Sequence, residues 1–391
     1  MSMGPKQPET SRRAPQRSLD SPELLVGRIL EGRYRLDSVL NKGGMGVVFE
    51  ATQVTVGRRV AVKILRPTLS QTPGLVKRFR LEVETVAQIS HPNVVGLIDS
   101  GRDAMGLIYL VMEFVEGKTL RQSLRSGDLK LWEILEVFSQ VCNALVETHG
   151  QHVIHRDLKL RNIMVVRMRD GAIHVKLLDF GVAKLLARDV DLTEGGQITG
   201  TPGIIAPELV DGDDPTAQSD LYSIGVLLFT ALAGQAPFSA TNDLELMRAH
   251  KVEPLPDLAQ MVGHQVPSYV VELTCQLLAK DPGERPRSAL ALRNRLDEMA
   301  RRIQHHHPDA TSYVAREPAL LSTSEVAAAE RIAADRMVDE LSLKVDSDPR
   351  SKSREPRREK ASDTVINPMV VIASSSVIFV IVLIMLIYIL V

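Results

Sequence analysis

The stretch HRDLKLRN at residues 155–162 decides the fold. It places one carboxylate, Asp157, just before Lys159 and Asn162. Asp157 could accept a hydroxyl proton as the hydroxyl oxygen attacks, and Lys159 could neutralise charge that develops on the group under attack. Asn162 adds a hard oxygen ligand of the kind that Mg²⁺ prefers. This order of side chains predicts a site that stabilises negative charge on a reacting group.

A second stretch, LLDFG at residues 177–181, follows closely and contributes Asp179. Together with Asn162 it completes a pair of oxygen ligands for Mg²⁺. Phosphoryl transfer depends mainly on positioning and on electrostatic stabilisation, and these groups provide both. Each residue alone could be a surface charge, but their order and spacing together favour phosphoryl-transfer chemistry.

A glycine-rich stretch, NKGGMGVV at residues 41–48, joins two expected strands, 33–40 and 46–53. A P-loop or a dinucleotide fingerprint needs a helix after the glycines, so both are disfavoured. Glycines let the backbone close over a polyphosphate without obstruction by side chains. Taken alone, the stretch fits a purely structural hairpin at least as well.

Lys63 lies in RVAVKIL (59–65), on the next expected strand. A lysine in so apolar a strand could simply extend from a sheet edge into water. Beneath a glycine-rich loop, however, its ammonium group is placed to pair with phosphate oxygens. Glu82, on an expected helix over residues 76–89, is a suitable carboxylate to hold it.

The order of the elements predicts an α+β fold with a small sheet-rich lobe followed by a larger helical lobe. Short alternating runs predict the strands 33–40, 46–53, 59–65 and 109–115. After about Leu131 the pattern becomes helical, except near residues 153–182.

With these motifs the chain resembles a eukaryotic-like (Hanks-type) serine/threonine protein kinase of the bacterial branch, over residues 34–300. The resemblance implies a bilobal protein kinase fold, ATP and Mg²⁺ as cofactors, and protein substrates phosphorylated on Ser or Thr, with autophosphorylation. It implies that Asp157 is the base, that Lys159 assists transfer, that Lys63 binds the α- and β-phosphates and pairs with Glu82, and that Asn162 and Asp179 hold Mg²⁺. It further implies a nucleotide site made of Asn41, Gly43, Gly44, Gly46, Val48, Lys63, Met112 as gatekeeper, and the backbones of Glu113 and Val115. Substrate docking falls to Thr201 and to the segment ending in Glu208, which would pair with Arg285, and Asp220 would orient the catalytic loop.

The sequence departs from the family pattern at Asn41, Leu160 and Ile204, which replace a glycine, a proline and an aromatic residue. Asparagine tolerates positive φ, so the loop turn is expected to survive. None of the three removes a group that touches phosphate or metal. A pseudokinase scaffold remains an alternative, as does a small-molecule kinase, which the GTPGIIAPE stretch disfavours because it resembles a platform for protein substrates.

The loop between Asp179 and Glu208 is expected to carry a phosphorylation switch. Arg156 could pair with a phosphate there and order the loop. Hydroxyl groups in the loop come from Thr193, Thr199 and Thr201. Because Thr201 resembles the threonine beside the base, Thr193 and Thr199 are the expected regulatory sites, with Thr193 favoured.

The composition of the chain indicates which kinds of partner are disfavoured and how its cysteines are used. The 47 basic residues nearly balance the 48 acidic ones, so no global field favours nucleic acid. The two cysteines, Cys142 and Cys275, lie in apolar, helix-like contexts and are expected to be buried reduced thiols rather than a disulfide or a nucleophile.

Flanking segments surround the expected kinase domain at 33–303. Residues 1–32 are polar, show no apolar stretch of a signal peptide, and are expected to be disordered. Residues 304–368 form an expected linker that opens on three histidines, 305–307, and includes a short helix near 322–345. The histidines could bind metal, but a solvated tract is the better interpretation because nothing nearby completes a site.

The chain ends in the uncharged run MVVIASSSVIFVIVLIMLIYILV, residues 369–391. At about 1.5 Å per residue this run reaches roughly 34 Å, enough to cross a hydrocarbon core of about 30 Å. The alternative is a hydrophobic packing helix. Basic residues at 350–360 precede the run, so the kinase domain is expected on the cytoplasmic face of the cell membrane, with the C-terminus on the far face. Membrane lipids and a second copy of the chain are therefore among the expected partners.

Overall fold

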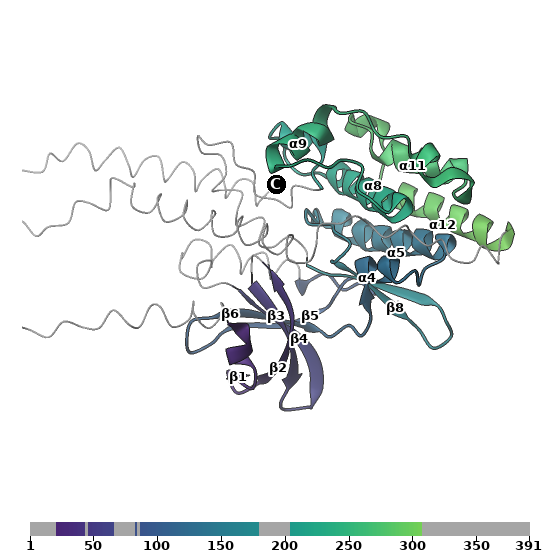
Figure 1. The fold of residues 1–391 in the computed structure, drawn as a ribbon. Coiled ribbons are helices and arrows are strands. Elements are labelled where there is room, and N and C mark those ends of the chain that lie inside the picture. The colour runs from purple at the N-terminus through teal and green to yellow at the C-terminus, as the bar shows by residue number, and fades with distance from the viewer. Residues whose placement is uncertain (1–20, 44–45, 66–82, 84–86, 180–203, 307–391) are drawn as a thin grey trace, which may run out of the picture. The chain divides into compact units, whose positions relative to one another are not determined.

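The computed structural model describes residues 21–43, 46–65, 83, 87–179 and 204–306. Within these ranges Figure 1 shows strands β1 to β6 gathered in one part and helices α5, α8, α9, α11 and α12 in another. We call these parts the small lobe and the large lobe. The order of a sheet first and helices afterwards confirms the α+β organisation expected from the sequence.

The small lobe is a six-stranded antiparallel sheet in the order β1-β2-β3-β4-β6-β5. The predicted strands 46–53 and 59–65 agree with the observed bounds to within one residue, whereas the first predicted strand ends three residues later than expected and the last ends two residues earlier. The strands are β1 (Ile29–Leu30), β2 (Tyr34–Gly43), β3 (Gly46–Gln53), β4 (Arg58–Leu65), β5 (Leu97–Arg102) and β6 (Ile108–Glu113).

Alternation along β4 explains which side chains fill the core of the small lobe. Val60, Val62 and Ile64 are fully buried, whereas Ala61 and Lys63 point to the opposite face. The buried face packs with Phe49 and with residues of the other strands. Lys63 is therefore left on the face that the core does not use.

The predicted disordered extension, 1–32, extends too far along the chain. The 3-10 helix η2 (Pro22–Leu25) and β1 both lie inside it. Leu25 and Leu30 are buried in the core of the small lobe, and Leu36 donates a backbone hydrogen bond to Arg28. These elements are too short to produce a period, so the sequence pattern did not reveal them. Residues 1–20 lie outside the described ranges.

The large lobe begins with a three-stranded sheet in the order β7-β8-β9 and continues with helices. Its sheet explains why residues 153–182 interrupt the helical pattern. The elements are β7 (Lys118–Thr119), α4 (Leu120–Arg125), α5 (Leu131–Gly150), β8 (Ile163–Arg167), β9 (Ile173–Leu177), α7 (Pro207–Val210), α8 (Ala217–Ala233), α9 (Asp243–Val252), α10 (Leu258–Val262), η3 (Gly263–Gln265), α11 (Ser268–Leu277), η4 (Pro282–Glu284) and α12 (Ala289–His306).

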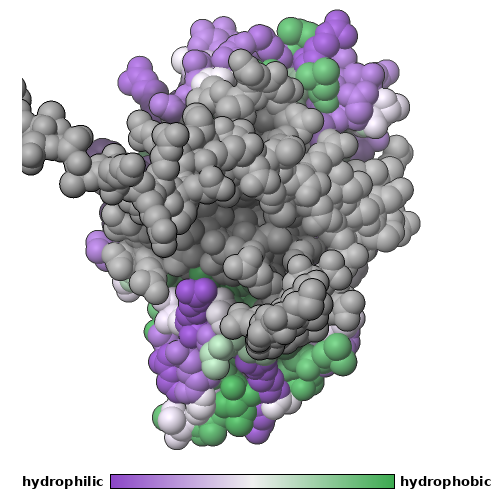
Figure 2. Space-filling model, turned by 90° about the vertical axis from the view of Figure 1, so that its left-hand side faces the viewer, coloured by the Kyte–Doolittle hydropathy of each residue, from purple (hydrophilic) through white to green (hydrophobic). Residues whose placement is uncertain are grey.

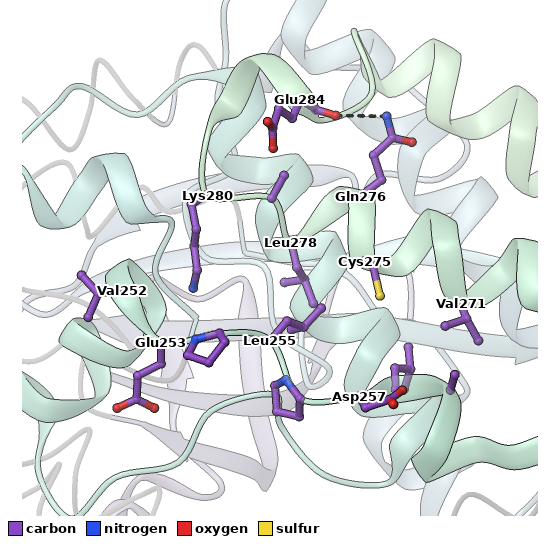
Figure 3. Close-up of a pocket in the computed structure, with 15 residues that line it drawn as sticks. Val252, Glu253, Leu255, Asp257, Val271, Cys275, Gln276, Leu278, Lys280 and Glu284 are labelled. Atoms are coloured by element: carbon purple, nitrogen blue, oxygen red, sulfur yellow. Dashed lines mark hydrogen bonds between the residues drawn. The ribbon is translucent and has the colours of Figure 1, made fainter.

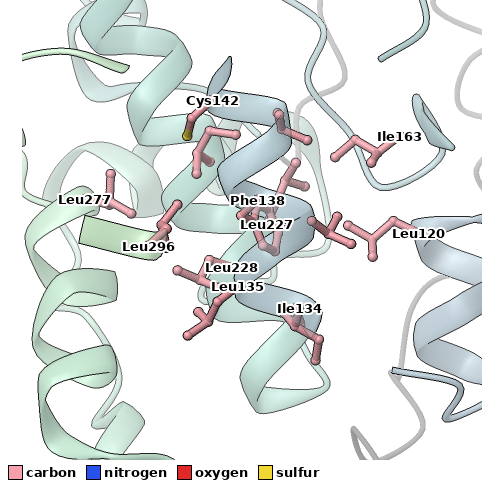
Figure 4. Packing of buried hydrophobic residues seen from close by; sticks show 14 of the residues in the cluster. Leu120, Ile134, Leu135, Phe138, Cys142, Ile163, Leu227, Leu228, Leu277 and Leu296 are labelled. Carbon is pink, nitrogen blue, oxygen red and sulfur yellow. The ribbon is translucent and has the colours of Figure 1, made fainter. Parts of the chain in front are cut away.

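Helix α5 organises the core of this lobe (Figure 4). Its apolar residues recur at helical spacing, so that Ile134, Phe138 and Cys142 are all buried along one stripe. They pack in one cluster with Leu227 of α8 and Leu296 of α12. Burial raises the pKa of the Cys142 thiol, which is buried as predicted, whereas the Cys275 thiol is free but only partly buried.

Helix α12 continues to His306, three residues beyond the expected domain end at 303. His305 and His306 thus close a helix rather than open a linker, and the described residues contain no cluster of three metal-binding side chains. Within the described ranges no helix is both long and apolar enough to span a bilayer, and the expected span at 369–391 lies outside those ranges. The expected helices at 76–89 and 322–345 lie mostly or wholly outside them as well.

The surface of the described small lobe mixes polar and apolar residues, as the lower part of Figure 2 shows. Aliphatic side chains such as Leu24 and Val56 are exposed there. Scattered exposed aliphatic residues are ordinary on soluble domains.

Candidate active site

The catalytic loop holds Asp157 through short local bonds. The backbone N–H of Asp157 donates to the His155 carbonyl at 2.8 Å and to His155 Nδ1 at 3.3 Å. Lys159 Nζ lies 3.1 Å from Asp157 Oδ2. Burial lowers the pKa of His155, so its imidazole is neutral and its Nε2 donates to the Leu178 carbonyl at 3.1 Å. The loop therefore presents a carboxylate with an ammonium group beside it.

Asn162 and Asp179, the expected metal ligands, are brought together by β8 and β9. Asn162 Nδ2 donates to the Asp157 carbonyl at 2.9 Å and to Asp157 Oδ2 at 3.1 Å. Leu178, next to Asp179, donates its N–H to the Asn162 carbonyl at 2.7 Å. Since the amide nitrogen of Asn162 is committed to Asp157, its Oδ1 is left as the group that can face a cation. These two oxygen donors fit a cation that takes its remaining ligands from phosphates and water.

Lys63 forms an ion pair with Asp179, whose Oδ1 lies 2.8 Å from Lys63 Nζ. The expected partner, Glu82, lies outside the described residues. The alternative of a lysine extending from a sheet edge is wrong, because β4 is an internal strand paired with both β3 and β6. The ammonium group from the small lobe thus meets the metal-site carboxylate of the large lobe.

The glycine-rich stretch is the hairpin between β2 and β3, as predicted. Asn41 pairs with Val48 and Gly43 pairs with Gly46, while Gly44 lies outside the described residues. Asn41 is part of strand β2 and is not among the described residues with positive φ, so the expected need for a left-handed turn there does not arise. A Cβ at Gly46 would lie 2.2 Å from the Ile64 carbonyl oxygen, so glycine is required there for close approach to β4.

The expected adenine-side residues end β6 and follow it. Met112 pairs with Ala61 on β4, and Val115 lies just after the strand. The N–H of Glu113 donates to the Gly96 carbonyl at 2.9 Å, which leaves the carbonyl of Glu113 as its backbone group for a nucleotide. The sequence pattern did not indicate the role of its side chain. The Glu113 carboxylate lies 2.6 Å from Lys176 Nζ on β9.

Asp220, in the first turn of α8, binds the backbone of the catalytic loop. It is 2% exposed, and its carboxylate accepts the backbone N–H groups of His155 at 2.9 Å and Arg156 at 3.1 Å. Its Oδ2 also lies 2.8 Å from His149 Nε2. Arg156 has a φ of 64°, a conformation that costs free energy for a side-chain-bearing residue. Asp220 thus holds the loop in a shape that the loop alone would not favour.

Glu208 pairs with Arg285, as the resemblance implied. The two guanidinium nitrogens of Arg285 donate to the two carboxylate oxygens at 2.9 Å and 2.8 Å, and Ser219 Oγ donates to Oε1 at 2.9 Å. Ile204 packs against the core of the large lobe. Thr193, Thr199 and Thr201 lie outside the described residues.

A groove of about 680 Å³ lies away from all of these residues, between the segment after α9 and helix α11 (Figure 3). Leu255, Leu278 and Cys275 contribute apolar walls, and Asp257 and Lys280 contribute charges. None of the predicted site residues lines it.

Comparison with known proteins agrees with this geometry. The model of the protein kinase domain family matches residues 34–296. A serine/threonine-protein kinase of Myxococcus xanthus, pkn3, is 35% identical over 288 residues, which cover 72% of this chain and 52% of that protein. The serine/threonine-protein kinase PknA of Mycobacterium tuberculosis is 38% identical over 268 residues, which cover 67% of this chain and 60% of that protein.

Among solved structures, the kinase domain of Mycobacterium tuberculosis PknI superposes with a TM-score of 0.55 at 22% identity, covering 70% of this chain and 98% of that one. At this identity the likeness concerns the fold alone. The match spans about half the length of pkn3.

The two lobes and the charged groups gathered between them are those of a protein kinase domain. The chain belongs to the protein kinase family.

Proposed function

We propose that the chain is a serine/threonine protein kinase that uses ATP and Mg²⁺ and phosphorylates protein substrates, itself included. The observation that carries this proposal is the convergence of Lys63, Asp157, Asn162 and Asp179 from separate strands and loops. The similarity to pkn3 of Myxococcus xanthus and to PknA of Mycobacterium tuberculosis, both serine/threonine-protein kinases, supports the choice of Ser and Thr over other acceptors.

The residues divide the work as follows. Asp157 accepts the proton of the substrate hydroxyl while that oxygen forms its bond to the γ-phosphorus and the bond to ADP breaks. Lys159, 3.1 Å from Asp157, stabilises the charge of the transferred group. Lys63 binds phosphate oxygens in place of its present partner, Asp179. Bound Mg²⁺ would neutralise phosphate charge, and Asn162 Oδ1 and Asp179 would hold it.

The pseudokinase alternative is less well supported. A scaffold has no need of a base, a phosphate-binding lysine and two metal ligands together. Here all four side chains are present. A continuous series of contacts leads from Lys63 to Asp179 and then, through Leu178, to Asn162 and Asp157.

Transfer of labelled phosphate from ATP tests the proposal, with the full chain in detergent and a generic Ser/Thr protein as acceptor. Asp157→Asn should abolish transfer while nucleotide binding remains. Asp243→Asn, an isosteric change at an exposed position on α9, serves as the matched control and should keep wild-type turnover. Transfer by Asp157→Asn at the wild-type rate would contradict the assignment.

We also propose that residues 369–391 anchor the chain in the cell membrane, with the kinase domain cytoplasmic. The support is the uncharged, apolar composition of these residues and the basic residues before them. Anionic lipids are suitable partners for the basic stretch at 350–360.

A further inference from the structure

Three arginines gather beside the catalytic loop. Arg121 and Arg125 lie four residues apart on α4 and so share one face of that helix. Arg161 belongs to the catalytic loop itself. The N–H of Arg121 donates to the carbonyl of Leu160, at 3.2 Å, which joins the start of α4 to the residue next to Arg161.

Local sequence fixes α4 in this place. Thr119 caps the helix: its side chain accepts the Gln122 N–H at 3.2 Å, and the Gln122 side chain accepts the Thr119 N–H at 2.8 Å. Leu120 and Leu124, on the adjoining face of α4, are buried in the core of the large lobe. The two arginines are therefore held next to the loop by the fold.

The arginines repel one another. Arg121 is only 8% exposed, and burial together with the charges of Arg161 and Arg125 lowers its pKa to about 10. Gathering like charges costs free energy, whereas an ion pair such as that of Arg28 with Asp103 compensates the charge of an arginine. Within the described part of the chain, neither Arg125 nor Arg161 has an ion-pair partner, and Arg125 is exposed.

We propose that Arg121, Arg125 and Arg161 form a subsite that binds acidic side chains of the peptide substrate. A carboxylate that enters this cluster relieves the repulsion and accepts charge-assisted hydrogen bonds from guanidinium groups. The inference rests on the proposed kinase function and adds to it a preference for acidic sequences around the acceptor hydroxyl.

Chain geometry limits how far the acidic residue lies from the acceptor. Arg161 follows Asp157 by four positions, so their Cα atoms are at most about 14 Å apart. An extended substrate advances about 3.3 Å per residue. The acidic residue is therefore expected within about four positions of the serine or threonine.

The chain itself contains a segment of this kind. Thr193 is preceded by Asp189 and Asp191 and followed by Glu194, whereas no acidic residue lies within four positions of Thr199. The arginine cluster therefore favours Thr193 over Thr199 as the site that one copy of the chain phosphorylates on another.

Two synthetic peptides test the subsite with the full chain in detergent. The first has the sequence of residues 187–198, and the second replaces Asp189 and Asp191 by Asn and Glu194 by Gln. We expect kcat/KM for the acidic peptide to exceed that for the amide peptide by about tenfold, mainly through KM, because charge-assisted contacts at several arginines add up. The ratio should fall with added salt.

Charge-reversal substitutions then show which arginines contribute to the subsite. Arg161→Glu should bring the ratio to one or below, and Arg161→Gln should lower it with less disturbance of folding. Arg125→Glu should lower it in part. Arg169→Glu, at an exposed position in the turn between β8 and β9, is the matched control and should keep the wild-type ratio.

The outcomes distinguish failure of the acidic subsite from failure of the proposed kinase function. Equal kcat/KM for the two peptides in the wild type would overturn the subsite and leave the kinase function intact. If neither peptide nor the chain itself is phosphorylated, the proposed function fails, and binding of Thr193→Val versions of both peptides, followed by fluorescence anisotropy, still tests the cluster. Tighter binding of the acidic version supports the subsite, and equal binding contradicts it.

Discussion

Arg285 donates one hydrogen bond to each carboxylate oxygen of Glu208, at 2.9 Å and 2.8 Å, with its own side chain 0% exposed and that of Glu208 10% exposed. The pair joins α7, which contains the end of the predicted docking segment, to the loop before α12. Arg285 also donates to the backbone carbonyls of Ala279, Lys280 and Gln218. One guanidinium group thus connects its own loop to α7 and α8, which lie 77 and 67 residues earlier in the sequence at Glu208 and Gln218.

Removal of this guanidinium group should destabilise the large lobe. We expect Arg285→Met to lower the free energy of unfolding by about 3–5 kcal/mol, because a buried carboxylate loses its partner. Urea unfolding followed by fluorescence of the single tryptophan, Trp132, measures it. Arg35→Met is the control: its ion pair with Asp37 is half exposed, and its loss should cost less than about 1 kcal/mol. Equal losses in the two variants would contradict the prediction.

The same pair should make stability depend on pH. Burial alone would raise the pKa of Glu208, but the hydrogen bonds and charge of Arg285, together with the hydrogen bonds from the backbone and from Ser219, outweigh it and hold the pKa below its ordinary value. The unfolded chain then binds a proton more readily than the folded one, so the stabilisation is complete above about pH 4.5 and is lost as the pH falls through the folded pKa. Glu208→Gln should therefore be less stable than wild type at pH 7, and the difference should shrink in acid. A difference that stays constant from pH 7 to pH 3 would argue against it.

Lys63 and Asp179 should each matter for turnover more than for folding. Lys63→Ala or Asp179→Asn should lower autophosphorylation by about 10²-fold or more, because the phosphates lose either the ammonium group or the Mg²⁺ that Asp179 would hold. Lys251→Ala, at an exposed residue of α9, should leave turnover unchanged. Circular dichroism of each variant shows whether the fold persists. Autophosphorylation near the wild-type rate in either site variant would remove these residues from the mechanism.

Deletion of residues 369–391 should release the kinase from membranes. The truncated chain is expected in the soluble fraction after cell breakage, with its kinase domain still folded, because the described hydrophobic clusters of both lobes are built from residues between Leu25 and Ile303. Full-length protein that is already soluble in high salt without detergent would refute the anchor. A C-terminal tag accessible to protease only from the outer face checks the orientation.

Phosphorylation of the loop between Asp179 and Glu208 should switch activity. We expect modification at Thr193 in preference to Thr199, with Arg156 as a partner for the phosphate. Mass spectrometry of the autophosphorylated chain locates the site, and Thr193→Ala should lower activity more than Thr199→Ala. If neither residue is modified and both variants remain fully active, the loop is not the switch.

Sequence motifs predicted the groups that do chemistry because their order along the chain carries the information. Asp157, Asn162 and Asp179 lie on loops whose local spacing sets their geometry, and Lys63 stands out as a charge among apolar neighbours. The strands at 46–53 and 59–65 were also predicted, because alternation over a whole strand gives a clear period.

Contacts that depend on tertiary packing could not be predicted in the same way. Glu113 and Lys176 meet only because β6 and β9 come together, and nothing in either segment indicates the other. The same holds for Arg121 and Arg161, which a helix and a loop bring together. Strand β1 is too short to give a period, which is why its burial was missed.

The contact of Asp220 with the catalytic loop has a consequence for how the motif can vary. Since a carboxylate on α8 fixes the direction of two successive peptide groups, at His155 and Arg156, the loop receives its conformation from the helix beneath it. The catalytic loop then does not need a rigid residue of its own, such as proline, to keep its conformation. Leu160 can stand where the family pattern predicts proline, because its side chain is 7% exposed within the core of the large lobe and its carbonyl accepts the backbone N–H of Arg121. Substitution at position 160 is therefore tolerated because Asp220, sixty positions away along the chain, fixes the conformation of the loop.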